Sequence, residues 1–563
     1  MSASPALVIV GSGLAGHTLA RSLASLGYAG SVTLVGEEHH APYDRPPLSK
    51  EFQRGDESAL MLQADGLAGV QVISGCKAVA IDTDRRVLAL SDGRHLPWDC
   101  LVLATGARPR PLAGSDPQAP VHFLRTLDDA RAIRAKLRDG LKLAVIGGGP
   151  IGLELAASAG QIGARVTVLE AAPRLMVRTV PPTIADFLLG HHRASGAEVL
   201  LGAQVKAIDP GGVALADGRR VEADLVVVGI GVVANDDLAR AAGIASDDGI
   251  FVDGRCRTTQ PDVYAIGDVT RQRNPISGRF ERIETWSNAR GQAQALARQL
   301  CGGADAAPGV MTGAAPWFWS DQGSLRLQCA GLPQGDQEAR RGDPATGLVV
   351  GQWCAGMLVG VAAINAPQDF NLLRRLLDSG QSISPEAFAA STELRSSPNH
   401  MPDGAPGTVP VTVAPSAAPP PAPSAAPPPA PSAAPPSPAP APSPPPAPAQ
   451  ATAPDLAACP LADIEEGAIG STCLPDGTRI AIYRIRGEEV FATDDKCSHG
   501  SSSLCDEGSL EGHLIECGLH LGSFDVRTGK PVSTPCTKAI RSYPAQVREG
   551  TIWIATQPIE PSP

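Results

Sequence analysis

A proline- and alanine-rich tract at residues 415–450 divides this chain into two parts that must fold separately. It reads PSAAPPPAPSAAPPPAPSAAPPSPAPAPSPPPAPAQ, a near-repeat of SAAPPPAP. Proline lacks the backbone N–H that helices and sheets need, and alanine and serine offer little to pack. The sequence predicts a linker over residues 401–454. Roughly 36 residues in polyproline II conformation, at about 3.1 Å each, reach on the order of 110 Å. A ligand for proline-binding modules is the alternative.

The two flanking segments carry different hydrophobic patterns. In residues 1–400, apolar β-type runs such as 7–10 and 141–146 alternate with helical stretches. This alternation predicts an α/β fold with a parallel sheet. Residues 455–557 hold short β-type runs, such as 480–485, broken by Gly, Asp and Pro, which predicts a small mostly-β domain.

Charge and cysteine content exclude several functional classes. The net charge is −11, and no Lys/Arg cluster is present that would neutralise nucleic-acid phosphates. No apolar run approaches the roughly 18 residues of a membrane-spanning helix. The 12 cysteines are scattered, which favours reduced thiols with a few recruited as ligands. We therefore expect a cytoplasmic enzyme that binds neither nucleic acid nor membrane.

The segment LVIVGSGLAG predicts a dinucleotide site near the N-terminus. Gly11, Gly13 and Gly16 follow an apolar strand and open a helix. Glycines at this spacing permit a tight turn and let a pyrophosphate approach the helix N-terminus. Glu37 ends the next strand, where a carboxylate accepts from a ribose diol.

The same unit recurs in KLAVIGGGPIGLELAASAGQIGARVTVLEAAPRL. Gly147, Gly149 and Gly152 precede the second helix, and Glu170 ends the following strand. A carboxylate that accepts from the 2′-hydroxyl would repel a 2′-phosphate, so Glu170 favours NADH over NADPH. Arg174 lies close in sequence and weakens that preference, which leaves residual NADPH use open.

Two such units in tandem resemble the glutathione-reductase-like flavoproteins, over residues 5 to about 395. Supporting segments are ATGARPR, DVYAIGDV and ERIETWSNA. The resemblance implies that Asp268 contacts the ribityl and pyrophosphate region of FAD. The domains it implies are a discontinuous FAD-binding domain (1–110 and 245–310), an NADH-binding domain (111–244) and a C-terminal interface domain (311–400).

A narrower resemblance is carried by APYDRPPLSK, residues 41–50, which is similar to the FAD-binding segment of ferredoxin reductases that serve bacterial oxygenases. It implies that Arg45 and Lys50 contact FAD; loop capping is their structural alternative. Glu154 matches a family position near the nicotinamide, where it pairs with Lys50, and we take these two residues as catalytic. The residues implied to contact FAD are Gly11, Gly13, Ala15, Gly16, Glu37, Arg45, Lys50, Val79, Ala104, Thr105, Gly106, Arg125, Asp268 and Trp286. Those implied to contact NADH are Gly147, Gly149, Ile151, Gly152, Glu170 and Gly231.

Dithiol chemistry is not expected. Disulfide reductases of this superfamily carry a CxxxxC motif shortly after the first nucleotide motif, but residues 37–75 contain no cysteine. Cys76 and Cys100 are too far apart in sequence to imitate that motif. We interpret both as small buried hydrophobes.

The second chemical centre is predicted in CSHGSSSLCDEGSLEGHLIECGLH. Cys497-x-His499 and Cys517-x-x-His520 are separated by 17 residues, a Rieske [2Fe-2S] pattern. Two thiolates on one iron and two neutral imidazoles on the other raise the reduction potential above that of an all-Cys cluster. A Cys₂His₂ zinc site is the alternative.

Residues 459 to 557 resemble the small Rieske ferredoxins of biphenyl- and toluene-type dioxygenases. Respiratory Rieske proteins carry an extra disulfide, and a Ser and a Tyr that donate to the cluster sulfurs. Here the corresponding region has Gly518 and Leu519 before His520, and Gly522 and Phe524 after it. Fewer donors predict a potential toward the low end of the Rieske range. Cys505 and Cys536 are interpreted as structural.

These expectations combine into an electron-transfer function. NADH releases two electrons as hydride and a [2Fe-2S] cluster accepts one, so FAD is expected between them. A separate terminal oxygenase, foremost a Rieske ring-hydroxylating dioxygenase, is the expected acceptor, and Trp317 and Trp319 line the exit route or belong to the core. The alternatives are a cytochrome P450 acceptor, a redox-signalling flavoprotein resembling apoptosis-inducing factor, and a regulatory Rieske domain with oxygen or quinone as acceptor. The oligomeric state stays open.

Overall fold

The computed structural model describes residues 5–302, 314–390 and 454–559, apart from 56, 58, 59, 61, 63–66, 113, 345, 499–501, 519–521, 534, 535 and 537. They form two compact units. The larger contains strands β1–β26 and the smaller contains β27–β37, and helix α7 (Pro367–Ser379) is divided between them after Leu372. Except for Pro454, the predicted linker lies outside the described residues.

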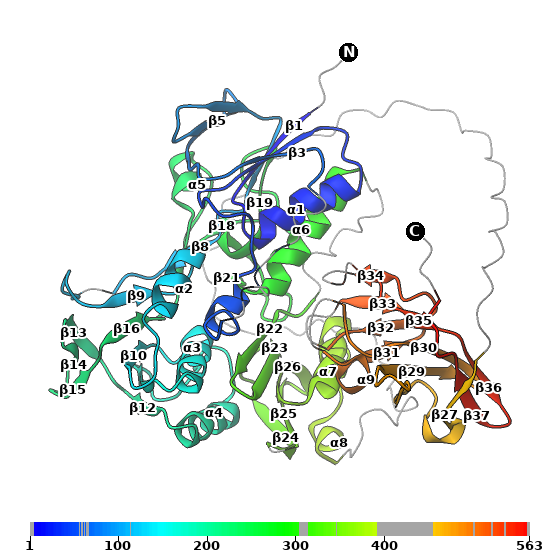
Figure 1. Ribbon diagram of the computed structural model, residues 1–563. Helices are drawn as coiled ribbons and strands as arrows, with labels where there is room; N and C mark the ends of the chain where they lie inside the picture. Colours follow the sequence, from blue (N-terminus) through cyan, green and yellow to red (C-terminus); the bar gives the residue numbers. More distant parts are fainter. Residues whose placement is uncertain are drawn as a thin grey trace, which may run out of the picture. The chain divides into compact units, whose positions relative to one another are not determined.

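The first glycine unit builds a five-stranded parallel sheet of order β19-β7-β1-β2-β3. Its central strand β1 (Ala6–Val10) is apolar and buried over four of its five residues. Helix α1 (Leu14–Ser25) follows the glycine turn and lies beside α6 (Trp286–Leu300) (Figure 1). The remaining strands are β2 (Ser31–Val35), β3 (Val70–Ile73), β7 (Cys100–Leu103) and β19 (Val263–Ala265).

The second glycine unit repeats this sheet with order β12-β11-β10-β16-β9, again parallel throughout. Helix α3 (Pro150–Gln161) takes the place of α1 after central strand β10. The edge strand β19 of the first sheet comes later in sequence than every strand of the second, so the second unit is inserted into the first. The strands are β9 (Val121–Phe123), β10 (Lys142–Ile146), β11 (Arg165–Glu170), β12 (Glu198–Leu201) and β16 (Leu225–Val228).

Small sheets and short helices accompany each parallel sheet. Three antiparallel strands follow β3, and three more follow β12. The first set is β4 (Ala78–Asp82), β5 (Val87–Leu90) and β6 (His95–Pro97), and the second is β13 (Val205–Asp209), β14 (Gly212–Leu215) and β15 (Arg220–Glu222). The other elements are β8 (Ala107–Pro109), β17 (Val232–Ala234), β18 (Ile250–Phe251), β20 (Thr270–Arg273), β21 (Phe280–Arg282), η1 (Pro46–Ser49), η3 (Gly267–Val269), α2 (Leu127–Arg134), α4 (Pro182–Ala194) and α5 (Asp237–Ala241).

A five-stranded antiparallel sheet of order β22-β23-β26-β25-β24 completes the larger unit. Strands β25 and β26 are almost continuously apolar and buried, whereas β24 is a charged, largely exposed edge strand. Charged edge strands resist pairing with other chains. The elements are β22 (Trp317–Gln322), β23 (Leu325–Gly331), β24 (Gln337–Asp343), β25 (Gly347–Cys354), β26 (Met357–Ile364) and α8 (Pro385–Ala390).

The smaller unit is mostly β, as its short apolar runs predicted. It contains three antiparallel sheets around a core that includes Tyr483, Phe524 and Ile552, each fully buried. The strands are β27 (Leu456–Pro460), β28 (Ile469–Cys473), β29 (Arg479–Arg486), β30 (Glu489–Asp494), β31 (Ser509–Glu511), β32 (Leu514–Glu516), β33 (Ser523–Asp525), β34 (Pro531–Ser533), β35 (Ser542–Tyr543), β36 (Ala545–Arg548) and β37 (Thr551–Ile554), with α9 at Leu504–Glu507.

Candidate functional site

The turn between β1 and α1 forms a cradle that only glycine can build. Gly11 has φ +113°, and a Cβ there would stand 2.1 Å from the carbonyl oxygen of Ala104. A Cβ on Gly16 would stand 1.9 Å from the carbonyl oxygen of Gly11, so Gly16 permits α1 to pack closely on the turn. Gly13 is the N-cap of α1, has no side-chain cap and faces open space. The first N–H groups of α1 are therefore available to an anion, as a dinucleotide pyrophosphate requires.

The second cradle repeats this geometry. Gly147 has φ +109°, and a Cβ on it would stand 2.4 Å from the carbonyl oxygen of Gly229. Gly149, the N-cap of α3, again faces open space. Pro150 occupies the first turn, where the N–H that proline lacks would have no partner within the helix. Both cradles fit a dinucleotide. Gly231, with φ +100°, and Ile151, which is 43% exposed, lie in the same nucleotide-binding half of the unit.

The carboxylates of Glu37, two residues after β2, and Glu170, the last residue of β11, have different partners. Glu37 is exposed and pairs with Lys77, at 3.2 Å between Oε1 and Nζ. Glu170 accepts from the backbone N–H of Gly148 at 2.6 Å and of Ala172 at 2.7 Å. Arg174 donates to the carbonyl oxygens of Val177 and Val180. The guanidinium of Arg174 is therefore directed at its own loop, and the predicted ribose contacts of both glutamates stay predictions.

Arg45 and Arg125 are joined in one half-buried network. Arg45 pairs with Glu38 at 2.8 Å and donates to the carbonyl oxygen of Arg125 at 2.7 Å. Arg125 pairs with Asp268, in η3, at 3.2 Å. Sequence reasoning missed Glu38, although it directly follows Glu37. The network brings Arg45, Arg125 and Asp268 together from three distant segments.

The ATGARPR segment is tied to Asn235, the residue that follows β17. Thr105 donates through Oγ1 to the carbonyl oxygen of Asn235 at 2.8 Å, and Asn235 donates through Nδ2 to the carbonyl oxygen of Thr105. Gly106 has φ +65°. Ala104 is buried, Ala15 is buried in α1, and Val79 is 52% exposed in β4. Val79 is therefore the most exposed of these candidates.

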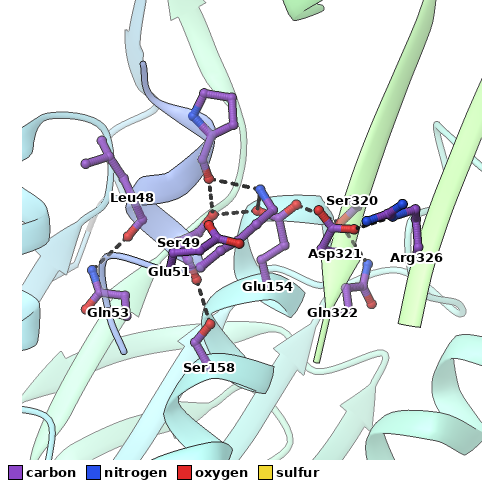
Figure 2. A network of polar contacts seen from close by, with 12 residues as sticks. Leu48, Ser49, Glu51, Gln53, Glu154, Ser158, Ser320, Asp321, Gln322 and Arg326 are labelled. Carbon is purple, nitrogen blue, oxygen red and sulfur yellow. Dashed lines mark hydrogen bonds and ion pairs between the residues drawn. The ribbon is translucent and has the colours of Figure 1, made fainter. Parts of the chain in front are cut away.

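Lys50 and Glu154 form a buried ion pair between the two dinucleotide-binding halves. Lys50 Nζ lies 2.9 Å from Glu154 Oε2, and the side chains are 6% and 5% exposed. Lys50 also donates to the carbonyl oxygen of Pro46 at 2.9 Å, and Ser49 Oγ donates to Glu154 Oε2 at 2.5 Å (Figure 2). The pairing predicted from the resemblance is present. Loss of either side chain would leave the other charge buried and unpaired, so the pair holds both side chains in place.

Three neighbouring tryptophans, Trp286, Trp319 and Trp317, begin at a contact with the APYDRPPLSK segment. Trp286 donates through Nε1 to the Asp44 carboxylate at 3.1 Å. The ring centroids of Trp286 and Trp319 are 5.8 Å apart, as are those of Trp317 and Trp319. Desolvation raises the pKa of Asp44 to about 6. Sequence reasoning missed Asp44, even though it lies within the APYDRPPLSK segment.

The cysteine ligands predicted for the iron-sulfur cluster are buried in one core. Cys497 follows β30, Cys517 follows β32, and both pack in the same apolar cluster as Cys536. Cys536 Sγ lies 3.6 Å from Cys497 Sγ, a neighbour that its structural interpretation did not foresee. Two buried thiols in adjacent loops suit the Cys half of a Rieske centre. His499 and His520 lie outside the described residues, among which no group of three or more metal-binding side chains is found.

Among the described residues, no helix is both long and apolar enough to span a bilayer.

Family models match three consecutive parts of the chain. Residues 5–293 match the pyridine nucleotide-disulphide oxidoreductases, residues 317–397 the reductase C-terminal domain, and residues 456–544 the Rieske [2Fe-2S] domain. These matches confirm FAD, NAD(H) and a [2Fe-2S] cluster as the cofactors.

Curated relatives cover the reductase part. The chain is 40% identical over 394 residues to the ferredoxin–NAD(+) reductase component of the p-cumate 2,3-dioxygenase system of Pseudomonas putida, covering 69% of this chain and 96% of that protein. It is 39% identical to the corresponding component of the anthranilate 1,2-dioxygenase system of Burkholderia cepacia, covering 70% and 98%.

Solved structures agree with this fold. The covalent putidaredoxin reductase–putidaredoxin complex superposes with a TM-score of 0.66 at 36% identity, covering 69% of this chain and 96% of that chain. The ferredoxin reductase for the CYP199A2 system of Rhodopseudomonas palustris gives a TM-score of 0.66 at 37% identity, covering 69% and 98%. The chain belongs to the FAD-dependent ferredoxin–NAD(+) reductase family and carries a Rieske [2Fe-2S] domain fused to its reductase part.

Proposed function

We propose that the chain carries electrons from NADH through FAD to its own Rieske cluster and then to a terminal oxygenase on another polypeptide, foremost a ring-hydroxylating dioxygenase. The observation that carries the proposal is the presence of a reductase and a Rieske domain in one chain. The relatives similar to the reductase part are named as components of p-cumate and anthranilate dioxygenase systems. We place the protein in the cytoplasm, where NADH is available.

The two cradles assign the nucleotides. Gly11, Gly13 and Gly16 would hold the FAD pyrophosphate against α1, and Gly147, Gly149 and Gly152 would hold that of NADH against α3. The other FAD and NADH residues named from the resemblance would complete the two sites. Bound FAD supplies the conversion between the two-electron chemistry of NADH and the one-electron chemistry of the cluster.

The other candidate residues would provide a fixed charge, the cluster ligands and an electron route. Lys50, held between Glu154 and the carbonyl oxygen of Pro46, presents a fixed, buried positive charge where the two halves meet. Such a charge favours negative charge that develops on an adjacent group. Cys497, His499, Cys517 and His520 would ligate the cluster. Trp319 and Trp317 would lead away from the flavin site into the C-terminal sheet.

The linker explains why the two modules are joined. Tethering converts a bimolecular encounter into an intramolecular one, with an effective concentration up to the mM range for flexible linkers. A long Pro/Ala-rich tether also lets the cluster domain leave the reductase and meet an oxygenase. The fusion therefore serves both the reduction of the cluster by the flavin and the transfer of electrons from the cluster to the oxygenase.

A cytochrome P450 is the second candidate acceptor. One observation favours it: one of the solved structures described above is the ferredoxin reductase of a CYP system. A redox-signalling role, or a regulatory Rieske domain, would need neither oxygenase.

Reconstitution tests the choice of acceptor. The purified full-length chain and NADH are combined with a Rieske aromatic-ring dioxygenase or with a bacterial P450, each with its substrate, and product is measured per NADH consumed. We expect coupled product formation with the dioxygenase and little with the P450. Coupled turnover with the P450 alone would reverse the assignment, and NADH consumption without product in either mixture would contradict an oxygenase partner.

A further inference from the structure

The carboxylate of Glu154 is held from two sides by different domains. Its Oε2 accepts from Ser49 and Lys50, which come from the segment around η1 in the FAD-binding half. Its Oε1 accepts a hydrogen bond of 2.8 Å from Ser320 Oγ, on β22 of the C-terminal domain. Glu154 is 4% exposed and Ser320 is fully buried. Figure 2 shows Ser320 and Ser49 on opposite sides of the Glu154 side chain.

Two further buried side chains stand behind Ser320. Gln322 Nε2 donates to Ser320 Oγ at 3.1 Å, and His192 Nε2 lies 2.8 Å from Gln322 Oε1. Gln322 is fully buried and His192 is 2% exposed. His192 belongs to α4 and Gln322 to β22, two positions after Ser320. Residues two apart on a strand share a face, so β22 directs both polar groups toward the dinucleotide-binding half.

The chemistry of the side chains gives this chain of bonds a direction. The Gln322 oxygen can only accept, so the His192 nitrogen that faces it carries the proton. The Gln322 amide then donates to Ser320 Oγ, which leaves the Ser320 proton to point at Glu154. Burial lowers the pKa of His192, which agrees with a neutral ring. The three hydrogen bonds therefore run in one direction, from His192 through Gln322 and Ser320 to the carboxylate. Hydrogen bonds aligned in this way polarise one another.

We infer that Ser320 is a positioning residue for the Lys50–Glu154 pair, and that Gln322 and His192 fix the direction of its hydroxyl. The inference rests on the proposed role of that pair beside FAD. Ser320 holds Glu154 Oε1, which leaves Glu154 Oε2 for Lys50 and Ser49. Without the hydroxyl, Oε1 loses its donor in a site with little access to water, so the carboxylate rotates to recover one and Lys50 is displaced. The C-terminal domain thereby tunes how readily NADH reduces the flavin.

Rapid mixing with NADH under anaerobic conditions tests this inference. Flavin bleaching in the FAD-loaded full chain separates the limiting reduction rate from the dissociation constant for NADH. For Ser320→Ala we expect a limiting rate about tenfold lower, since hydrogen bonds to charged groups are among the stronger ones, with the dissociation constant changed less than about twofold. Ser320→Thr, which keeps a hydroxyl, should restore most of the rate. Gln322→Leu should give a smaller loss than Ser320→Ala.

Ser158→Ala is the matched control. Ser158 is a buried serine on the same helix as Glu154, four positions later, and its hydroxyl donates to the carbonyl oxygen of Ser49 rather than to the carboxylate. We expect both parameters to stay within about twofold of the parent protein. Equal losses in Ser158→Ala and Ser320→Ala would show a general packing effect and overturn the inference.

A double variant and an equilibrium readout complete the test. If Ser320 acts through Glu154, Ser320→Ala should cause no further slowing in a Glu154→Gln background. The flavin midpoint potential, measured with reference dyes and no NADH, should shift in Ser320→Ala and return in Ser320→Thr. A full additional loss in the Glu154→Gln background, or an unmoved potential, overturns the inference. If Lys50→Met and Glu154→Gln leave the rate of flavin reduction unchanged, the assumed role of the ion pair is wrong. If NADH does not reduce the flavin of the parent protein, the proposed function is wrong.

Discussion

Asp44 shows how desolvation changes the chemistry of a residue. Its carboxylate accepts from the Trp286 indole, while desolvation raises its pKa from 3.8 to about 6. Well below pH 4 the group is protonated in both the folded and the unfolded chain. As the pH rises through the window from 4 to 6, the unfolded chain loses the proton first, so the folded state loses stability.

The first prediction concerns Asp44→Asn. A shift of about two pKa units corresponds to up to about 3 kcal/mol. The difference in unfolding free energy between Asp44→Asn and the parent should therefore increase in favour of the variant by up to that amount as the pH rises from about 4 to 6.5. Above that range the difference should be constant. Chemical unfolding of the FAD-free chain across this pH range measures it, and a difference that does not vary with pH would contradict the assignment.

The second prediction concerns Glu170, which accepts from the backbone N–H of Gly148 and of Ala172. Glu170→Ala leaves both donors without their acceptor and removes the charge that disfavours a 2′-phosphate. We expect the KM for NADH to rise about tenfold and the preference for NADH over NADPH to narrow, as steady-state kinetics with both nucleotides would show. Arg174→Ala is the comparison, because its guanidinium donates to Val177 and Val180 and should not affect that preference. A larger change in preference for Arg174→Ala than for Glu170→Ala would reverse these roles.

At the scale of elements, local patterns predicted the strands and glycine turns well. The apolar runs 7–10 and 141–146 coincide closely with β1 and β10, and the helices begin where the glycine spacing indicated. These features depend on residues close together in sequence. The contacts of Glu154 with Ser49 and Ser320 span 105 and 166 positions, so no local pattern could pair them. The alternation in WFWSDQ did contain the signal that Ser320 and Gln322 share a face.

The third prediction compares the two glycines of the β1–α1 turn. Gly13→Ala adds a Cβ where no atom lies within 4 Å, so the FAD-free chain should keep its thermal stability while FAD affinity falls at least about tenfold, because the methyl group fills the cradle. Gly11→Ala combines positive φ with a contact at 2.1 Å, and should destabilise folding by about 3 kcal/mol or more. Differential scanning fluorimetry and FAD retention separate the two effects. Equal stability losses would argue against the open space at Gly13.

At the scale of the whole molecule, composition predicted two folding units, and the family models confirm the cofactors that the motifs predicted for each unit. The break in composition at residues 415–450 separates the strands of the reductase from those of the Rieske domain. The predicted ligands His499 and His520 lie outside the described residues, so that half of the cluster site stays a prediction from the CxH and CxxH spacing.

The fourth prediction tests the tether. Cleavage at a protease site inserted into the Pro/Ala-rich tract should leave flavin reduction by NADH unchanged. Cluster reduction should become second order, and at about 10 μM protein it should slow at least about tenfold, because the tether supplies effective concentrations up to the mM range. Stopped-flow absorbance at several protein concentrations measures it. Concentration-independent cluster reduction after complete cleavage would contradict intramolecular delivery as the purpose of the fusion.

The most direct test of the proposed electron path is an anaerobic titration of the full-length protein with NADH. Flavin absorbance and the electron paramagnetic resonance signal of the reduced cluster are followed together. We expect a Rieske-type signal to appear as NADH is added, at stoichiometries that account for the electrons taken up by flavin and cluster. Flavin bleaching with a silent cluster would contradict the NADH to FAD to [2Fe-2S] route and would favour a signalling or regulatory role.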